Sequence, residues 1–247
     1  MTPPVPPFSV SAHAARVVFG GDVLFDALDL TLPAGQWTCL LGPSGVGKST
    51  LMRHLLGLEG NGHDSVTCSD GGPLAGRAAY MAQTDGLLPW LSVLDNVLLG
   101  ARLRGERSPD RARARDLLAA VGLSAVADQR PATLSGGMRQ RAALARTLME
   151  DRPALSMHDP FSVLDSITLL RLQDLAARLL AGRTVFLVTH DPLEALRLGH
   201  RILVLSGRPA RLGPPLTPDG APPRPVADPA VLEMQGELLS RLAEAAA

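Results

Sequence analysis

The sequence has a single lysine, two cysteines and no excess of charge of either sign. Its 24 basic residues equal its 24 acidic residues in number, so the formal net charge is zero. The positive potential that draws a protein to a phosphate backbone is therefore missing, and nucleic acid is not expected as a partner. The cysteines, Cys39 and Cys68, are too few for a disulfide framework, which favours a reducing compartment.

Long apolar runs are also missing from the sequence. No run approaches the roughly 18 residues that a membrane-spanning helix needs. Residues 1–10 hold four prolines and no basic residue, unlike an export signal. We therefore expect neither a transmembrane span nor a signal peptide. Hydrophobic residues nevertheless make up 46% of the 247 residues, enough for one large or two small domains with a core.

Proline is concentrated near the two ends. Twelve of the 21 prolines lie in residues 1–7 or 209–229, which predicts irregular flanks around a folded body. We predict a main domain over 8–208 and a Pro-rich flank with a terminal helix over 209–247. That helix is expected to start near Pro229, because apolar residues follow at helical spacing.

The body alternates short apolar runs with helical patterns. The runs at 37–41, 154–157, 185–189 and 202–205 are brief enough to be buried parallel strands. Over about 87–150 the sequence instead has Leu, Ala and Arg at helical spacing. Strand-like runs resume afterwards, so we predict an α/β fold with an inserted helical subdomain.

A glycine-rich loop follows the first predicted strand. It consists of Gly42, Pro43, Ser44, Gly45, Val46, Gly47, Lys48, Ser49 and Thr50. This loop matches the Walker A pattern, and the helical stretch that the pattern requires follows it. Such a loop turns successive N–H groups and a helix N-terminus toward phosphate oxygens, and the Ser49 hydroxyl is suited to Mg²⁺. The loop therefore predicts a nucleotide site.

Lys48 is the one lysine in a chain whose other 23 basic residues are arginine. A compact ammonium reaches the β- and γ-phosphates in a way that a planar guanidinium does not. The place of Lys48 in the loop thus explains this departure from the rest of the chain. It favours nucleotide binding over a chance glycine-rich turn.

A second small-residue turn opens another predicted helix, at 138–149. The turn contains Ser135, Gly136 and Gly137, within Leu-Ser-Gly-Gly-Met-Arg-Gln-Arg. The two motifs together resemble the Walker A and signature motifs of the ABC transporter ATPases, and the resemblance covers residues 16–206. It implies a RecA-like phosphate-loop NTPase fold: a mostly parallel sheet, an antiparallel β edge and the inserted helical subdomain. It also implies ATP and Mg²⁺ as cofactors.

The resemblance assigns further residues by their position in the motifs. Gln83 matches the Q-loop glutamine, Asp165 the D-loop, and His190 the switch histidine that contacts the γ-phosphate. Phe19 matches the aromatic residue that stacks on adenine. The resemblance places Ser49 and Gln83 at the metal.

In this family the signature motif of one subunit closes on the ATP held by the Walker A loop of another. The resemblance therefore implies a homodimer with two composite ATP sites. It also implies integral membrane permease subunits, contacted in part through residues 87–93, and, indirectly, a periplasmic or extracellular solute-binding protein. The chain is then expected at the cytoplasmic face of the membrane, attached through the permease.

The sequence departs from the family shortly before the D-loop. The family has an Asp that orients water around Mg²⁺, followed by a Glu that polarises the attacking water, whereas this chain has His158 and Asp159. Imidazole is a poorer partner for Mg²⁺ than a carboxylate, and aspartate is one methylene shorter than glutamate. We expect ATP binding to survive and hydrolysis to be slow.

Residues 85–106, 135–153 and 160–177 are similar to importer ATPases of the nitrate, sulfonate, taurine and hydroxymethylpyrimidine group. Residues 161–168 and 171–175 look most like the hydroxymethylpyrimidine (thiamine precursor) branch. Two function classes stay open: the ATP-hydrolysing motor of an importer, and a hydrolysis-poor nucleotide-binding module for dimerisation or regulation. A soluble nucleotide kinase is a third, but it leaves the second glycine-rich motif unexplained.

Overall fold

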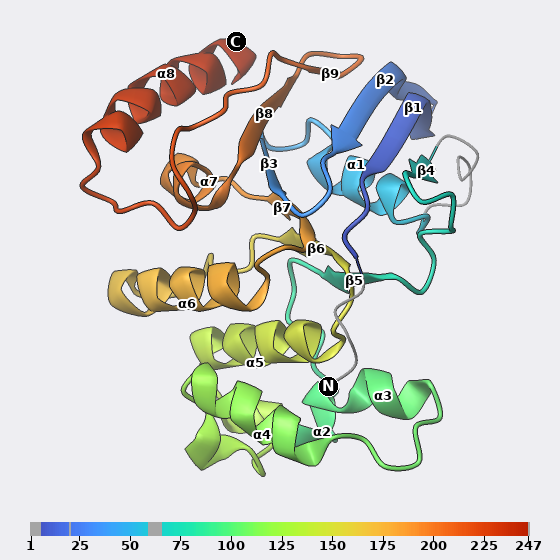
Figure 1. Ribbon diagram of the computed structural model, residues 1–247, viewed down its shortest axis with the longest axis vertical. Coiled ribbons are helices and arrows are strands. Elements are labelled where there is room, and N and C mark those ends of the chain that lie inside the picture. The colour runs from blue at the N-terminus through green and yellow to red at the C-terminus, as the bar shows by residue number, and fades with distance from the viewer. Residues whose placement is uncertain (1–5, 20, 59–65, 247) are drawn as a thin grey trace. The chain divides into compact units, whose positions relative to one another are not determined.

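The computed structural model describes residues 6–19, 21–58 and 66–246 (Figure 1). The chain divides into two units, each built from separate stretches of sequence. The first unit comprises Met1–Ala78, Pro153–His158 and Leu180–Ala247, and the second comprises Ala79–Arg152 and Asp159–Leu179.

A mostly parallel sheet organises the first unit. Within this unit the strand order is β6-β7-β3-β8-β9, and only the pairing of β8 with β9 is antiparallel among these described strands. Every residue of β3, β6 and β7 is buried, which explains why these segments are largely continuous apolar runs. The predicted α/β class is confirmed. The strands are β3 (Trp37–Leu41), β6 (Ala154–His158), β7 (Thr184–Val188), β8 (Arg201–Ser206) and β9 (Arg211–Leu212).

A second sheet of the same unit is antiparallel. Its order is β2-β1-β4, with β1 at Val10–Phe19, β2 at Asp22–Leu32 and β4 at Val66–Cys68. This sheet is the antiparallel edge that the resemblance implied. One apolar core joins the two sheets, since Phe25 of β2 belongs to the same buried cluster as Leu40 of β3.

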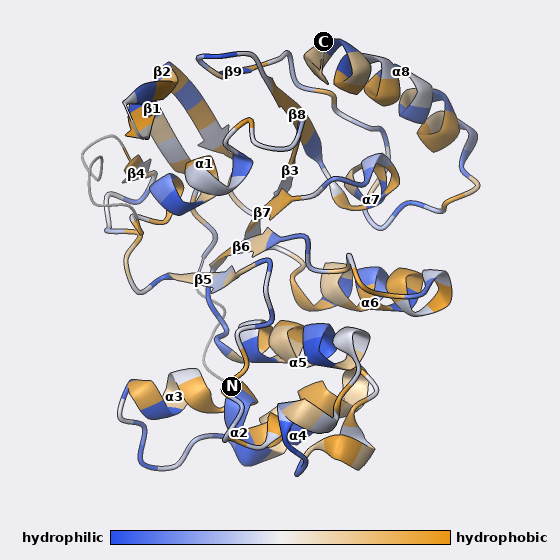
Figure 2. Ribbon diagram, turned by 180° about the vertical axis from the view of Figure 1, so that it is seen from behind, coloured by the Kyte–Doolittle hydropathy of each residue, from blue (hydrophilic) through white to orange (hydrophobic). Residues whose placement is uncertain are grey.

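The helices of the first unit are α1 (Lys48–Leu55), α7 (Pro192–Leu198) and α8 (Pro229–Ala246). The last of these packs against α7 and β8 and buries Val231 and Leu238. Figure 2 shows hydrophobic and hydrophilic residues mixed along α8, as expected for a helix with one buried face. Over the described residues, no helix is both long enough and apolar enough to cross a membrane.

Apart from β9 and the first residue of α8, the Pro-rich segment 209–229 is irregular, and Arg224 fixes it to the first unit. The Arg224 side chain is buried, and its guanidinium donates to the carbonyl oxygens of Leu196 and Gly199, both at 2.8 Å. It also donates to three carbonyl oxygens of the segment itself. The planar fork of N–H donors in arginine suits such a cluster of carbonyls. The predicted flank is therefore anchored to the first unit.

The chain enters the second unit within β5 (Ala78–Met81). Beyond β5, the described part of this unit is helical, and α5 packs against α2 and α4. The unit is larger than the predicted insertion at 87–150, because it also includes α6. Its helices are α2 (Val93–Val97), α3 (Leu99–Leu103), α4 (Arg111–Ala120), α5 (Gly136–Met149) and α6 (Ser166–Leu179), with 3₁₀ turns at Ser124–Val126 and Pro131–Thr133.

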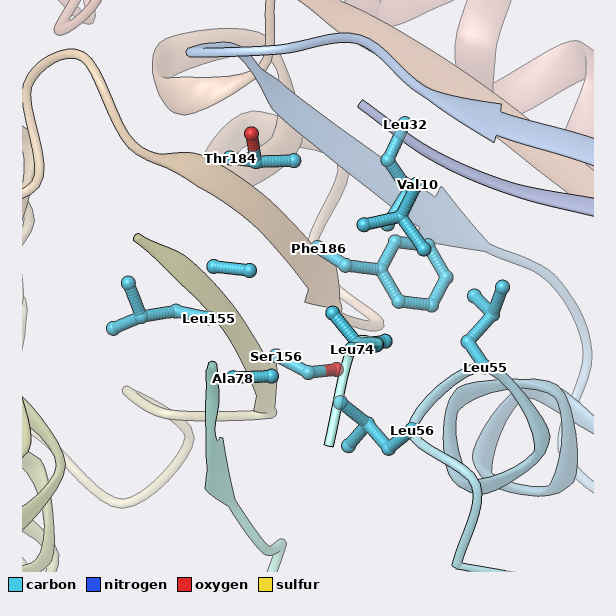
Figure 3. Close-up of a pocket in the computed structure, with 11 residues that line it drawn as sticks. Val10, Leu32, Leu55, Leu56, Leu74, Ala78, Leu155, Ser156, Thr184 and Phe186 are labelled. Carbon is cyan, nitrogen blue, oxygen red and sulfur yellow. The ribbon is translucent and has the colours of Figure 1, made fainter. Parts of the chain in front are cut away.

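A small apolar pocket lies in the first unit between residues of α1, β1, β6 and β7 (Figure 3). Leu55 of α1 and Ser156 of β6 both line it. The Ser156 hydroxyl is buried and has no hydrogen-bond partner among the described residues. Alternate residues of a strand share a face, so Ser156 and His158 place two polar side chains on the face of β6 that meets α1.

Candidate nucleotide-binding site

The Walker A loop joins the end of β3 to the start of α1, at the carboxyl edge of the parallel sheet. Two of its glycines are required by the backbone. Gly42 has a φ of 149°, and a Cβ atom there would lie 2.3 Å from the carbonyl oxygen of Leu205. Gly47 has a φ of 107°, and a Cβ atom there would lie 2.8 Å from Cζ of Phe25. The curvature of the loop therefore depends on glycine at both positions.

The tip of the loop is exposed to solvent. Ser44 and Gly45 are exposed, whereas Val46 is buried and anchors the loop. A Cβ atom at Gly45 would have no described atom within 4 Å. Helix α1 follows Gly47, and this N-cap residue contributes no side-chain hydrogen bond. The N–H groups of the first turn are therefore suited to hold an anion such as a phosphate group.

Lys48 is the first residue of α1, and its side chain turns back to the loop. Its Nζ donates hydrogen bonds to the carbonyl oxygens of Gly42 at 2.7 Å and Pro43 at 2.8 Å. Ser49 and Thr50 follow in the first turn of the helix and are half-buried. The structure thus brings the predicted phosphate-binding residues of the loop together around one helix start.

His158 is the last residue of β6, and its side chain is 6% exposed. Its Nε2 lies 3.5 Å from Oγ of Ser49, although 109 residues separate the two in the chain. The predicted metal position is therefore bordered by a hydroxyl oxygen and an imidazole nitrogen. Mg²⁺ prefers oxygen ligands in tight octahedral geometry, so this donor pair suits Mg²⁺ poorly.

Two further predicted site residues belong to the first unit. His190 is exposed between β7 and α7, next to Asp191, which caps α7 by accepting a hydrogen bond from the N–H of Leu193 at 2.9 Å. Phe19 is the last residue of β1, where it pairs with Asp22 of β2. The Phe19 side chain lies outside the described part of the structure. The roles assigned to His190 and Phe19 stay predictions.

In the second unit, Gln83 is exposed in the loop that follows β5. Helix α5 holds this loop, because Arg146 donates to the carbonyl oxygens of Asp85 at 2.7 Å and Gly86 at 2.8 Å. Arg139 forms an ion pair with the Asp85 carboxylate at 3.0 Å. Burial lowers the pKa of the Arg146 guanidinium. The sequence prediction missed both arginines, although their spacing places them on one face of a helix.

The second glycine-rich motif forms the start of α5. The predicted start at residue 138 is wrong, because the helix begins at Gly136 with Ser135 as its N-cap. Oγ of Ser135 accepts a hydrogen bond from the N–H of Met138 at 3.3 Å, so the helix includes the two glycines that looked like part of a turn. Cβ atoms at Gly136 and Gly137 would lie 3.3 Å and 3.1 Å from atoms of Val163. Glycine therefore leaves room here for the predicted D-loop.

Asp159 follows β6 directly, is buried and has a φ of 46°. Aspartate adopts this left-handed backbone more readily than most residues. The Asp159 carbonyl oxygen accepts from Nε2 of Gln140 at 3.1 Å and from Oγ of Ser162 at 3.2 Å. Gln140 lies in the signature segment, but the sequence prediction gave it no role. It fixes the backbone of a predicted catalytic residue.

Asp165 is exposed at the start of α6. Its Oδ1 accepts a hydrogen bond from the N–H of Thr168 at 3.0 Å. Hydrogen bonds from Thr168 hold the pKa of Asp165 below its ordinary value. Asp165 thus caps α6 as an ionised carboxylate. Its predicted D-loop role is not tested by this arrangement.

Asn96 holds the segment 87–93, which the resemblance assigned to a permease contact. The Asn96 side chain is fully buried, and its Oδ1 accepts from the N–H of Leu88 at 2.7 Å. Its Nδ2 donates to the carbonyl oxygens of Leu88 at 3.1 Å and Ser92 at 2.9 Å. Trp90 in this segment is 66% exposed. The segment is therefore fixed in shape while a large aromatic side chain faces solvent.

The profile of the family described as "ABC transporter" matches residues 25–162. The chain belongs to the ABC transporter family. An uncharacterized ABC transporter ATP-binding protein of Haemophilus influenzae is 43% identical over 230 residues, which are 92% of this chain and 95% of that protein. An aliphatic sulfonates import ATP-binding protein of Nocardia farcinica is 44% identical over 239 residues, 96% of this chain and 93% of its own length.

Solved structures show the same ABC fold. A dimeric ATP-binding cassette in a post-hydrolysis state, bound to ADP and Pi, matches with a TM-score of 0.75 and 28% identity. The match covers 86% of this chain and 100% of the cassette. The predicted phosphate-loop NTPase fold is confirmed. The chain is an ATP-binding subunit of the ABC class, an ATPase coupled to transport, and relatives named for sulfonate import support the predicted importer group.

Proposed function

We propose that this ABC protein binds and hydrolyses ATP as a subunit of an importer for a small solute. The proposal is carried by the Walker A loop, where a curved glycine backbone, a helix start with no side-chain cap and the Lys48 ammonium meet. These features supply the N–H donors and the positive charge that a triphosphate requires. The ATP-binding domain would span 8–208, with the helical insertion at about 87–150 and the flank and terminal helix at 209–247.

In the proposed site, different residues of the first unit bind different parts of ATP. The backbone N–H groups of residues 42–50 hold the phosphates, and Lys48 binds the β- and γ-phosphates. Phe19 stacks on the adenine ring. His190 contacts the γ-phosphate, a role supported by its exposed position at the carboxyl end of β7.

We propose a homodimer with two composite ATP sites. In each site, Ser135, Gly136 and Gly137 of one copy complete the site built on the Walker A loop of the other copy. The dimeric state of the solved cassettes, which are 28% identical to this chain, supports this arrangement. Next to Asp165, the apolar side chain of Val163 is 58% exposed, and a second copy would cover it.

The proposed transport partners are integral membrane permease subunits. The fixed segment 87–93 and the exposed ring of Trp90 are suited to receive a permease element. Gln83, in the loop held by α5, would link bound nucleotide to this surface. The chain would lie at the cytoplasmic face of the membrane through the permease, and a periplasmic or extracellular solute-binding protein would deliver the solute.

The proposed cargo is a small solute of the sulfonate type. The support is the identity of 41–44% to relatives of Burkholderia cenocepacia and Nocardia farcinica that are named for aliphatic sulfonate import. The similarity of residues 161–168 and 171–175 to the hydroxymethylpyrimidine branch favours the thiamine precursor as a second candidate. Uptake of each solute by cells that carry or lack the complete transporter discriminates between them.

We propose that hydrolysis is slow in Mg²⁺. His158 Nε2 borders the Ser49 hydroxyl at 3.5 Å, and Asp159 is too short to reproduce the reach of a glutamate. The same contact favours the second candidate function, a hydrolysis-poor module that binds ATP and dimerises without rapid turnover. In both cases ATP binding itself is retained, because the Walker A loop is intact.

The test is ATP turnover in Mg²⁺ by the chain assembled with its permease. We compare the native chain with His158→Asp, Asp159→Glu and the double variant. Restoring the carboxylate at 158 should raise turnover about 10- to 100-fold, the usual scale for a group that orients metal-bound water. Asp159→Glu alone should give a smaller gain, because glutamate fits the φ of 46° less well. Native turnover equal to that of His158→Asp would overturn the proposed slow hydrolysis.

A further inference from the structure

We propose that the cation bound with ATP in this chain is a first-row transition-metal dication, held by the His158 imidazole together with the Ser49 hydroxyl, and not Mg²⁺. The proposal rests on the proposed function, since it requires ATP to bind at the Walker A loop. It concerns the metal ligands that the chain itself supplies.

The distance between the two donor atoms fits a shared ion. His158 Nε2 and Ser49 Oγ lie 3.5 Å apart. Two neighbouring ligands at ~2.1 Å from one metal are about 3.0 Å apart in octahedral geometry and about 3.4 Å apart in tetrahedral geometry. A shift of a few tenths of an ångström therefore places one ion in contact with both atoms.

The backbone positions of both donors are fixed. His158 ends a fully buried strand and pairs with Val188 of β7, and its side chain is 6% exposed. Ser49 lies in the first turn of α1, next to Lys48, whose ammonium is hydrogen-bonded to the loop. The imidazole is therefore a buried group beside the first turn of α1, and it is not a surface histidine.

The chemistry of an N,O donor pair selects against Mg²⁺. Mg²⁺ requires near-ideal octahedral oxygen coordination, whereas imidazole nitrogen suits Zn²⁺, Co²⁺ and Ni²⁺. In the described part of the chain, no group of three or more His, Cys, Asp or Glu side chains is placed to hold a metal ion. The remaining ligands would then be phosphate oxygens and water. The ion binds as a metal–nucleotide complex, and the single nitrogen decides which ion is preferred.

The first measurement is the affinity of the intact chain, without a polyhistidine tag, for a non-hydrolysable ATP analogue in Mg²⁺ and in Co²⁺. The native chain should favour the Co²⁺ complex, and His158→Asp should shift the ratio of the two affinities toward Mg²⁺ by about 10- to 100-fold. His13→Asp is the matched control, because His13 is exposed on β1 and the same chemical change there should leave the ratio unaltered. Cys39 and Cys68 are buried, which limits competition for Co²⁺ by thiols.

The second measurement requires no variant. The native chain is labelled with ¹⁵N-histidine and loaded with Mn²⁺ and the same analogue, and pulsed electron paramagnetic resonance reports nuclei bonded to the ion. A ¹⁵N coupling from histidine is expected for the native chain and for the control His13→Asp, and it should be lost in His158→Asp. This signal reports direct ligation independently of ATP turnover.

The outcomes separate the two proposals. If the analogue binds in neither cation, the proposed nucleotide-binding function fails. If it binds in both, but His158→Asp leaves the affinity ratio unchanged and no ¹⁵N coupling appears, the metal inference alone is overturned and the nucleotide-binding function stands.

Discussion

The molecule starts two helices with glycine-rich turns, and glycine serves a different purpose in each. Before α1, Gly42, Gly45 and Gly47 have φ angles of 149°, 79° and 107°, which only glycine adopts easily. At the start of α5, Gly136 and Gly137 are helical residues, and a Cβ atom on either would lie within 3.3 Å of Val163. The first turn needs glycine for its backbone conformation, whereas in the second turn glycine allows the close approach of Val163 to an ordinary helical backbone.

The two helix starts also differ in their caps. No side chain caps α1 at Gly47, whereas Ser135 caps α5 by accepting from the N–H of Met138. An uncapped start offers its N–H groups to a ligand, while a capped start has already used one of them. Similar glycine-rich motifs are therefore not equivalent anion sites. It fits the proposed roles, in which the Walker A loop binds nucleotide and the signature motif completes the site from a second copy.

The largest effect on stability is expected where alanine replaces a glycine that the backbone conformation requires. In Gly42→Ala the new methyl group would meet the Leu205 carbonyl oxygen at 2.3 Å in a left-handed backbone. The free energy of unfolding should fall by about 3 kcal/mol or more, because strain and overpacking add. Gly136→Ala is the matched comparison: its methyl group meets the side chain of Val163 at 3.3 Å, and alanine favours the helix. Denaturant unfolding should show little loss for Gly136→Ala, and equal losses in the two variants would contradict the distinction.

The second-largest effect is expected for substitution of Lys48, which should lower the affinity for nucleotide. Lys48→Ala removes a charge-assisted hydrogen-bond donor to phosphate, a loss of roughly 2–3 kcal/mol, or about 100-fold in affinity. Lys48→Arg should restore little of it, because a planar guanidinium does not fit the space of an ammonium held by Gly42 and Pro43. Equilibrium titration with ATP measures both variants, and unchanged thermal midpoints serve as the control. Native affinity in Lys48→Arg would show that the single lysine has no special role.

The smallest effect is expected at the caps. Ser135→Ala and Ser92→Ala each remove a serine N-cap, whose hydroxyl accepts from Met138 at 3.3 Å and from Asp95 at 3.0 Å. Each should lower the free energy of unfolding by about 1 kcal/mol. Only Ser135→Ala should also weaken dimer formation with an ATP analogue, measured by sedimentation velocity. Dimer formation unchanged in Ser135→Ala would remove Ser135 from the composite site.

The sequence predicted the elements whose signals are local. The Walker A loop, the buried strands and the terminal helix each have a pattern within about ten consecutive residues, and the structure contains all of them near the predicted bounds. The start of α5 was placed two residues late, because a serine cap before two glycines looks like a turn. Contacts between distant segments had no such signal. In the sequence, nothing distinguishes Arg224 from the other residues of the Pro-rich flank. In the structure its guanidinium donates hydrogen bonds to five carbonyl oxygens.

By itself, the sequence determined that the chain has a phosphate loop with one lysine, a second glycine-rich helix start, and a histidine where its family has a carboxylate. The first two are facts of composition and spacing along the chain, and the third follows from the resemblance to the family. Only the tertiary structure decided that the imidazole of His158 meets the hydroxyl of Ser49 at 3.5 Å. The physical reason is that a parallel sheet gathers the carboxyl ends of its strands at one edge, so side chains 109 residues apart meet only after the strands pair.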